Sequence, residues 1–461
     1  MSLGYKFVPP APQVLAQLYA DYLRYRKTTR KPVSFKRYLK RIGFTDPTAR
    51  FKGGDDGMRR VRAAGVKLVA VPKRAVSGTV RVIVLLVDFP DKPATRNPHE
   101  FEDMLFSTGT FQTGSLNDFY AEVTLGKVNV TGSVHGWFRM PRKYDYYVNN
   151  QSGTGPYPKN AQKLTEDALA AAKKQNVAFE PALDNFSDGT ITALVVVHAG
   201  RGAETFTNKL GQDTNIWSHK ADLQKPVTVT PALNATNYLT IPEDARMGVC
   251  AHELGHLLFQ WDDFYDPNYA EDGSEWDGSG VWDLMAGGSW NNGGLTPAHP
   301  AGLHKLQHGW TEVQDVMAST AGVVLPPYTK TFGRIVRIRG AHFSPTQSVV
   351  LENRRRTGFD RMLPGEGLLV WRVDTALEQN RPDNPAMALV QADGRHDLDR
   401  PDDQNQGDAG DPFPGPQGTN VTLGDTGDVS TSFPAGPSGI SLSNISVDSQ
   451  TGVISLDIKI G

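Results

Sequence analysis

Hydrophobic and polar positions divide the chain into stretches with different periodicities. Near the start, apolar residues recur at helical spacing and predict a short amphipathic helix: Leu15, Leu18, Tyr19, Tyr22 and Leu23. Two uninterrupted apolar runs, within residues 79–89 and 191–200, are bounded by turn residues and predict buried strands. Residues 115–140 alternate between helix-like and strand-like patterns. Helices placed between strands indicate an α/β or α+β arrangement of layers.

The pattern changes at about residue 312. Short apolar runs such as GVVL, RIVRIRG, SVVLENR and GLLVWRV are then separated by Gly, Pro, Asp and Ser, which is typical of an all-β region. We therefore expect an N-terminal extension over residues 1–76, a mixed domain over residues 77–310 and a β-rich domain over residues 311–461.

Composition and charge exclude several classes of protein. The chain has 461 residues, of which 39% are hydrophobic and 21% charged, as in ordinary globular proteins. A formal net charge of −2 argues against a general nucleic-acid binder, which usually carries a basic excess. Every apolar run falls far short of the ~20 residues that a membrane-spanning helix needs. With Cys250 as the single cysteine, neither an intramolecular disulfide nor a site with several thiolate ligands can form.

The strongest chemical signal is the sequence HELGH at residues 252–256. On a helix, positions i and i+4 share one face, so His252 and His256 can direct their imidazoles at one zinc ion. Glu253 lies beside these ligands and can act as general base toward a water in the open coordination position. Apolar neighbours on the other helix face predict that this helix is embedded in a core.

Two histidines need a third protein ligand. Asp262 lies six residues after His256, which matches the extended pattern HExxHxxGxxH/D. Phe259 stands where that pattern has glycine, so the turn must differ, and Asp263 and Asp266 remain alternative ligands. Downstream, Met285 lies in the Gly-bounded sequence GVWDLMAGG, which predicts a Met-turn that forms an apolar floor beneath the metal.

Taken together, these motifs resemble the immune inhibitor A family of zinc metallopeptidases, within the metzincin group. The resemblance covers nearly all of the chain after residue 78 and includes VIVLLVDFPDKP, LVVVHAGRGAE, IWSHK, VWDLMAGGSW and PAGLHKLQHGW in order. It implies an α+β fold: a metzincin-like mixed-sheet catalytic domain with a zinc-binding active-site helix, plus a β-rich C-terminal region. It also implies endopeptidase activity on proteins, zinc at the two histidines with an acidic third ligand, structural calcium and export from the cell.

Calcium is also indicated by two acidic clusters, because hard oxygen ligands in loops suit this ion. The first cluster comprises Asp263, Asp266, Asn268, Glu271, Asp272 and Asp277, and the second comprises Asp397, Asp399, Asp402, Asp403, Asp408 and Asp411.

Residues 1–76 resemble the pro-region expected in such peptidases. Asp55 and Asp56, in a Gly-flanked loop, motivate the hypothesis that a carboxylate from this segment occupies the open zinc position and keeps the enzyme latent. The alternative is an ordinary turn.

The sequence thus predicts a zinc-dependent endopeptidase that acts on a protein or peptide substrate, with no nucleic-acid partner and no membrane span. Two other interpretations stay open: a non-catalytic, zinc-containing surface-binding protein and a metallohydrolase of non-peptide substrates. The resemblance implies an extracellular location. No apolar signal segment is visible in the first residues, so a cytoplasmic location is the alternative.

Overall fold

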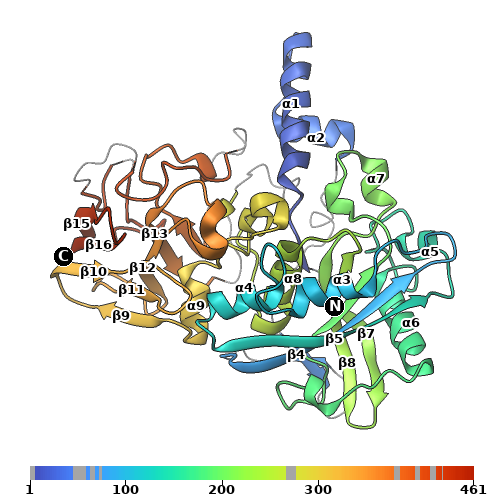
Figure 1. Cartoon of the computed structure of the whole chain (residues 1–461). Coiled ribbons are helices and arrows are strands. Elements are labelled where there is room, and N and C mark those ends of the chain that lie inside the picture. The colour runs from blue at the N-terminus through green and yellow to red at the C-terminus, as the bar shows by residue number, and fades with distance from the viewer. Residues whose placement is uncertain are drawn as a thin grey trace.

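The computed structural model describes residues 6–44, 59–62, 68–71, 75–265, 277–377, 385–399, 405–415, 422–427 and 429–461. These residues form a mixed α+β structure in which helices cover one large sheet and the C-terminal part is almost entirely strands (Figure 1). The described part of the chain has no helix that combines the length and the apolar character needed to span a bilayer.

The main sheet of the described residues has the strand order β1-β7-β8-β6-β4-β5. Its strands are β1 (Lys6–Phe7), β4 (Gly78–Asp88), β5 (Val128–Arg139), β6 (Leu194–His198), β7 (His219–Thr230) and β8 (Leu233–Pro242). The β5, β4, β6 and β8 strands are parallel, while β7 pairs antiparallel with β8. The two predicted buried strands correspond to β4 and β6, and residues 115–140 contain a helix followed by β5.

Helices pack on this sheet through apolar side chains. The helices of this part are α3 (Pro98–Phe106), α4 (Leu116–Val123), α5 (Tyr144–Val148), α6 (Ala161–Lys174), α7 (Lys209–Asp213), α8 (Met247–Phe259) and α9 (Gly302–His308). Residues of α3, α4 and α8 line one small apolar cavity together with Val82, Val195 and Leu239 of the sheet. These three helices therefore cover the same face of the sheet, and α8 follows directly on β8.

The C-terminal part contains two further sheets. One has the order β14-β13-β12-β11-β9 and the other the order β10-β16-β15. Their strands are β9 (Glu312–Val316), β10 (Thr320–Leu325), β11 (Arg334–Ile338), β12 (Gln347–Arg354), β13 (Gly367–Asp374), β14 (Met387–Leu389), β15 (Ile440–Val447) and β16 (Ile454–Ile460). Buried side chains of both sheets, such as Val323, Leu351 and Leu442, share one core.

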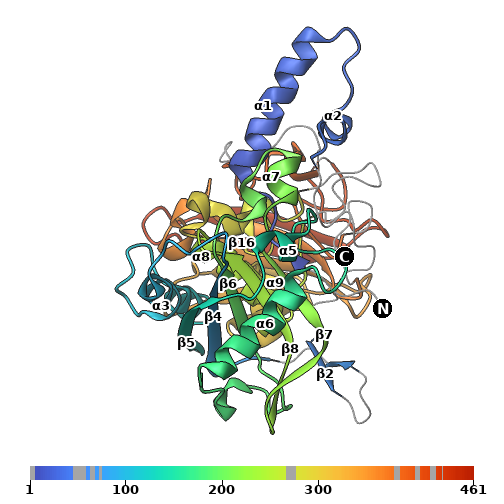
Figure 2. The ribbon, with the colours of Figure 1, turned by 90° about the vertical axis from the view of Figure 1, so that its right-hand side faces the viewer.

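The N-terminal residues join the main sheet and then leave it. Strand β1 pairs antiparallel with β7, so that it forms the edge of the sheet. Helices α1 (Pro12–Thr28) and α2 (Phe35–Ile42) then project from the body of the protein (Figures 1 and 2). Helix α1 is longer than the apolar pattern predicted, and Leu23 faces solvent instead of the packed side. A short separate pair of strands comprises β2 (Arg59–Arg62) and β3 (Leu68–Val71).

Candidate metal centre

The HELGH sequence lies on α8, and every residue of this helix is buried. The helix is therefore a core element, as its apolar flanks predicted. It ends where Gln260 adopts a left-handed backbone conformation with φ of 57° and donates its N–H to the Gly255 carbonyl oxygen. That turn redirects the chain back toward the face that carries the two histidines.

Hydrogen bonds to backbone carbonyl oxygens fix both histidine rings. The Nδ1 atom of His252 lies 2.9 Å from the Leu284 carbonyl oxygen, and Nδ1 of His256 lies 2.7 Å from that of Trp261. A carbonyl oxygen can only accept, so each Nδ1 donates and each Nε2 presents a lone pair. The two Nε2 atoms face each other at 3.1 Å. Two lone pairs this close repel each other unless a cation lies between them.

The carboxylate that completes this group belongs to Asp263. Its Oδ1 atom lies 3.3 Å from Nε2 of His252 and 3.1 Å from Nε2 of His256. Asp262, the expected third ligand, is not in the group, so the structure favours the alternative residue. The physical reason is the chain path after α8: the Trp261 N–H bonds the Gly255 carbonyl, and the Phe264 N–H bonds the Met285 carbonyl. Asp266, the other alternative, lies outside the described residues.

The three donor atoms fit the geometry of a zinc site. Ligand atoms at neighbouring corners of a tetrahedron around zinc lie roughly 3.3 Å apart when each bond is about 2.0–2.1 Å long. The observed separations of 3.1–3.3 Å match that spacing. Two imidazoles and one carboxylate also form a donor set typical of catalytic zinc, in which one position stays open for water.

Met285 lies against the same helix. It is fully buried, and a methyl group added to Gly255 would lie only 2.8 Å from its sulfur atom. The glycine between the two histidines therefore lets the methionine approach the helix backbone. This contact was not predicted, because spacing along the sequence does not reveal which side chain packs on Gly255.

Glu253 is also fully buried, and neither of its carboxylate oxygens has a hydrogen-bond partner among the described residues. Burial raises its pKa well above the usual value, and the charges of Asp263 and Glu204 raise it further. Nearby backbone amides of Val8 and Lys220 oppose this rise. The carboxylate therefore lies near Asp263 and near the backbone of Val8 and Lys220.

The structure brings only part of the two predicted acidic clusters together. Asp397 and Asp408 come together with Asp393, with one oxygen of each within 4.8 Å of the others. Asp393 was not part of the predicted cluster, which begins four residues later, at Asp397. Most of the first predicted calcium cluster lies outside the described residues, as do Asp55 and Asp56.

Comparisons with known proteins identify the family of this chain. Residues 71–315, just over half of the chain, match the family described as immune inhibitor A peptidase M6, catalytic domain. A pre-pro-metalloprotease, PrtV, of Vibrio cholerae is 30% identical over 267 residues, which cover 48% of this chain and 28% of the relative. An immune inhibitor A of Bacillus thuringiensis is 32% identical over 275 residues, which cover 49% of this chain and 39% of the relative. The chain thus spans well under half the length of these relatives.

The class defined by this match is that of the metalloendopeptidases, which are hydrolases. Within that class, the chain belongs to the immune inhibitor A peptidase family M6.

Proposed function

We propose that this protein is a zinc-dependent endopeptidase with Glu253 as general base. The observation that carries the proposal is the convergence of His252, His256 and Asp263, whose donor atoms have the mutual spacing of zinc ligands. Met285 under the helix supports assignment to the metzincin group. The catalytic domain would extend over residues 77–310 and the β-rich C-terminal domain over residues 311–461.

The histidines and Glu253 then have separate roles in peptide hydrolysis. Bound zinc supplies a Lewis acid that polarises the scissile carbonyl and lowers the pKa of a water. The hydrogen bonds from Nδ1 to the Leu284 and Trp261 carbonyls keep both histidines in the tautomer that can bind the metal. Glu253 takes the proton of the attacking water at a carboxylate oxygen and returns it to the leaving nitrogen.

Metal removal tests this function. The purified chain is expected to contain about one zinc and to cleave casein, to lose that activity on dialysis against phenanthroline, and to regain it with zinc but not with magnesium. Elemental analysis and a casein assay measure both properties. Zinc binding without cleavage of casein or of a broad peptide library would favour the surface-binding interpretation. Cleavage of small esters alone would favour a non-peptide hydrolase.

We also propose that the N-terminal segment restricts access to the centre. Residues 6–7 pair with β7 as the edge strand β1, and the chain then continues to residue 11. Along this path the Trp217 indole donates to the Val8 carbonyl at 2.9 Å, and the Ala11 N–H donates to the Glu204 carbonyl at 3.1 Å. Peptides commonly bind by adding a strand to a sheet edge. Since Val8 lies close to Glu253, this segment occupies the edge that an extended substrate would use.

Loosening the segment should therefore accelerate peptide hydrolysis. Ala11 is fully buried, so Ala11→Trp would overpack its site and weaken docking, with an expected increase of roughly 5- to 100-fold in kcat/KM. Ala16→Trp is the matched control, because Ala16 is exposed on the adjoining helix α1. Equal rates for Ala11→Trp and the parent chain, at equal unfolding temperature, would show that the segment does not limit access.

The structure and the comparisons also bear on calcium and on location. The half-buried group of Asp393, Asp397 and Asp408 offers hard oxygen ligands and is our proposed calcium site. The name of the Vibrio relative denotes a precursor with pre- and pro-segments. On that basis we propose export to the extracellular space, with proteins as substrates.

A further inference from the structure

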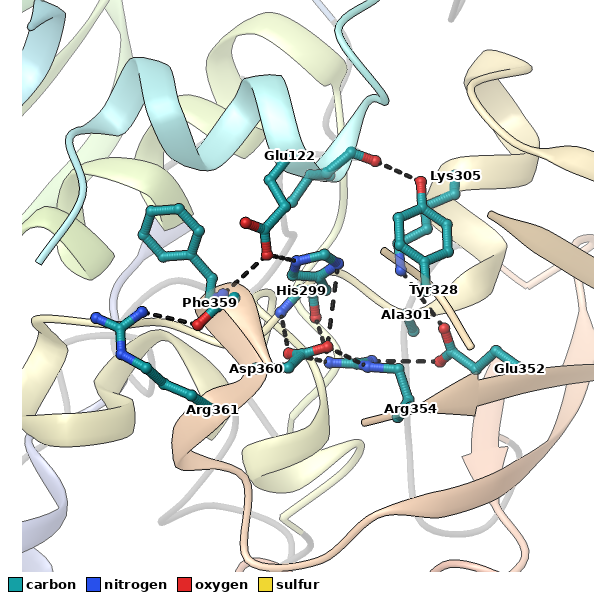
Figure 3. A network of polar contacts seen from close by, with 12 residues as sticks. Glu122, His299, Ala301, Lys305, Tyr328, Glu352, Arg354, Phe359, Asp360 and Arg361 are labelled. Carbon is teal, nitrogen blue, oxygen red and sulfur yellow. Dashed lines mark hydrogen bonds and ion pairs between the residues drawn. The ribbon is translucent and has the colours of Figure 1, made fainter. Parts of the chain in front are cut away.

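A buried network of charges joins the catalytic part to the C-terminal sheets (Figure 3). At its centre is Arg354, the last residue of β12, whose side chain is fully buried. Its Nε and Nη2 atoms donate to the two carboxylate oxygens of Asp360 at 2.6 and 2.7 Å. Glu352 lies on the other side, 3.4 Å from Nη1. These contacts hold the planar guanidinium in one orientation.

The same guanidinium reaches out of the C-terminal part to the backbone around the Met-turn. Nη1 donates to the Trp282 carbonyl at 3.0 Å, and Nη2 lies 3.4 Å from the His299 carbonyl. Asp360 reinforces the second contact, because its Oδ1 accepts the His299 N–H at 2.9 Å. One arginine therefore ties two separate stretches of the catalytic part to β12.

These two stretches hold the residue that orients a proposed zinc ligand. The Leu284 N–H donates to the His299 carbonyl at 3.3 Å, and the Leu284 carbonyl accepts from Nδ1 of His252 at 2.9 Å. The next carbonyl, that of Met285, accepts the Phe264 N–H at 2.9 Å and so anchors the backbone beside Asp263. Hydrogen bonds and the short stretches of backbone between them thus connect Arg354 with His252 and Asp263.

We propose that Arg354 is a positioning residue for the metal centre: it holds residues 282–285 so that the Leu284 and Met285 carbonyls orient His252 and Asp263. The inference rests on the proposed function in that it takes these residues as ligands. It gives the C-terminal domain a part in metal binding, because the arginine that holds the Met-turn belongs to β12.

Only an arginine satisfies all of these contacts. Its planar fork supplies parallel donors to Asp360 while Nη1 remains available for the Trp282 carbonyl. A lysine ammonium keeps the positive charge beside Asp360 and Glu352. It is a single donor group, however, and cannot hydrogen-bond to Asp360 and to the Trp282 carbonyl at the same time. Arg354→Lys therefore separates the positioning role from simple neutralisation of the buried acids.

The test is made on the full chain with Arg354→Lys, using exposed Arg356→Lys as the matched control. Zinc affinity is measured by competition with a chromophoric chelator, and amide exchange at Leu284 is followed in the metal-free protein. We expect Arg354→Lys to bind zinc about 10- to 100-fold more weakly, as for loss of partners that orient metal ligands. We also expect faster exchange at Leu284, whereas Arg356→Lys should match the parent chain in both measurements.

Unchanged zinc affinity and unchanged Leu284 exchange in folded Arg354→Lys would overturn the proposal. If that variant does not fold, Asp360→Asn provides the second test, since it keeps an acceptor for the His299 N–H but removes the charge that aligns Arg354. It should shift both measurements in the same direction, and parent-like values for it would equally overturn the proposal. A parent chain that binds zinc but cleaves no peptide would contradict the proposed function and leave the Arg354 result intact.

Discussion

Glu253→Gln is expected to lower kcat/KM for peptide hydrolysis by about 10²- to 10⁴-fold, the range typical of a lost general base. The amide has nearly the shape of the carboxylate but cannot accept the proton of the attacking water. Because Glu253 is not one of the proposed ligands, zinc content should stay at the parental level. A peptide-cleavage assay combined with elemental analysis measures the two effects separately.

Glu180→Gln is a suitable control for this experiment, because Glu180 is exposed and lies far along the chain from α8. It should retain parental activity. If Glu253→Gln cleaved peptides at close to the parental rate with zinc bound, another group would have to move the proton. The proposed mechanism would then be wrong even if zinc is required.

Asp263→Ala is expected to weaken zinc binding by more than about 100-fold, since loss of a direct ligand should exceed the effect of losing a partner that merely orients one. The structure places the Oδ1 atom of Asp263 within 3.3 Å of both Nε2 atoms. Asp262→Ala removes the same group from the neighbouring residue and should bind zinc almost as tightly as the parent chain. Competition with a chromophoric chelator at constant pH compares the three proteins.

Comparison of the two variants shows whether Asp262 or Asp263 is the third zinc ligand. Weak binding by Asp262→Ala together with tight binding by Asp263→Ala would restore the spacing expected from HExxHxxGxxH/D. Circular dichroism and unfolding temperature check that neither variant has lost its fold. Asp263 is 5% exposed, so a modest loss of stability in its alanine variant would not by itself contradict the assignment.

Local patterns in the sequence were sufficient to predict the strands and the histidine-bearing helix, because these features depend on residues that are neighbours along the chain. The apolar runs became β4 and β6 because continuous β-branched stretches can be buried on both faces of a sheet. The spacing of His252 and His256 placed both rings on one side of α8 because a helix repeats every 3.6 residues. The short apolar runs after residue 312 likewise became the strands of the C-terminal sheets.

Tertiary structure alone decided the features that join distant residues. The position of Asp263 beside the two histidines depends on the left-handed conformation of Gln260 and on the hydrogen bond from the Phe264 N–H to the Met285 carbonyl. The spacing of the motif encodes neither of these features. The pairing of β1 with β7 brings together residues more than 200 positions apart. Arg354 reaches the Trp282 carbonyl only because the tertiary fold brings the end of β12 beside residue 282. Such contacts depend on the packing of whole sheets and helices, so a periodic pattern within one segment cannot specify them.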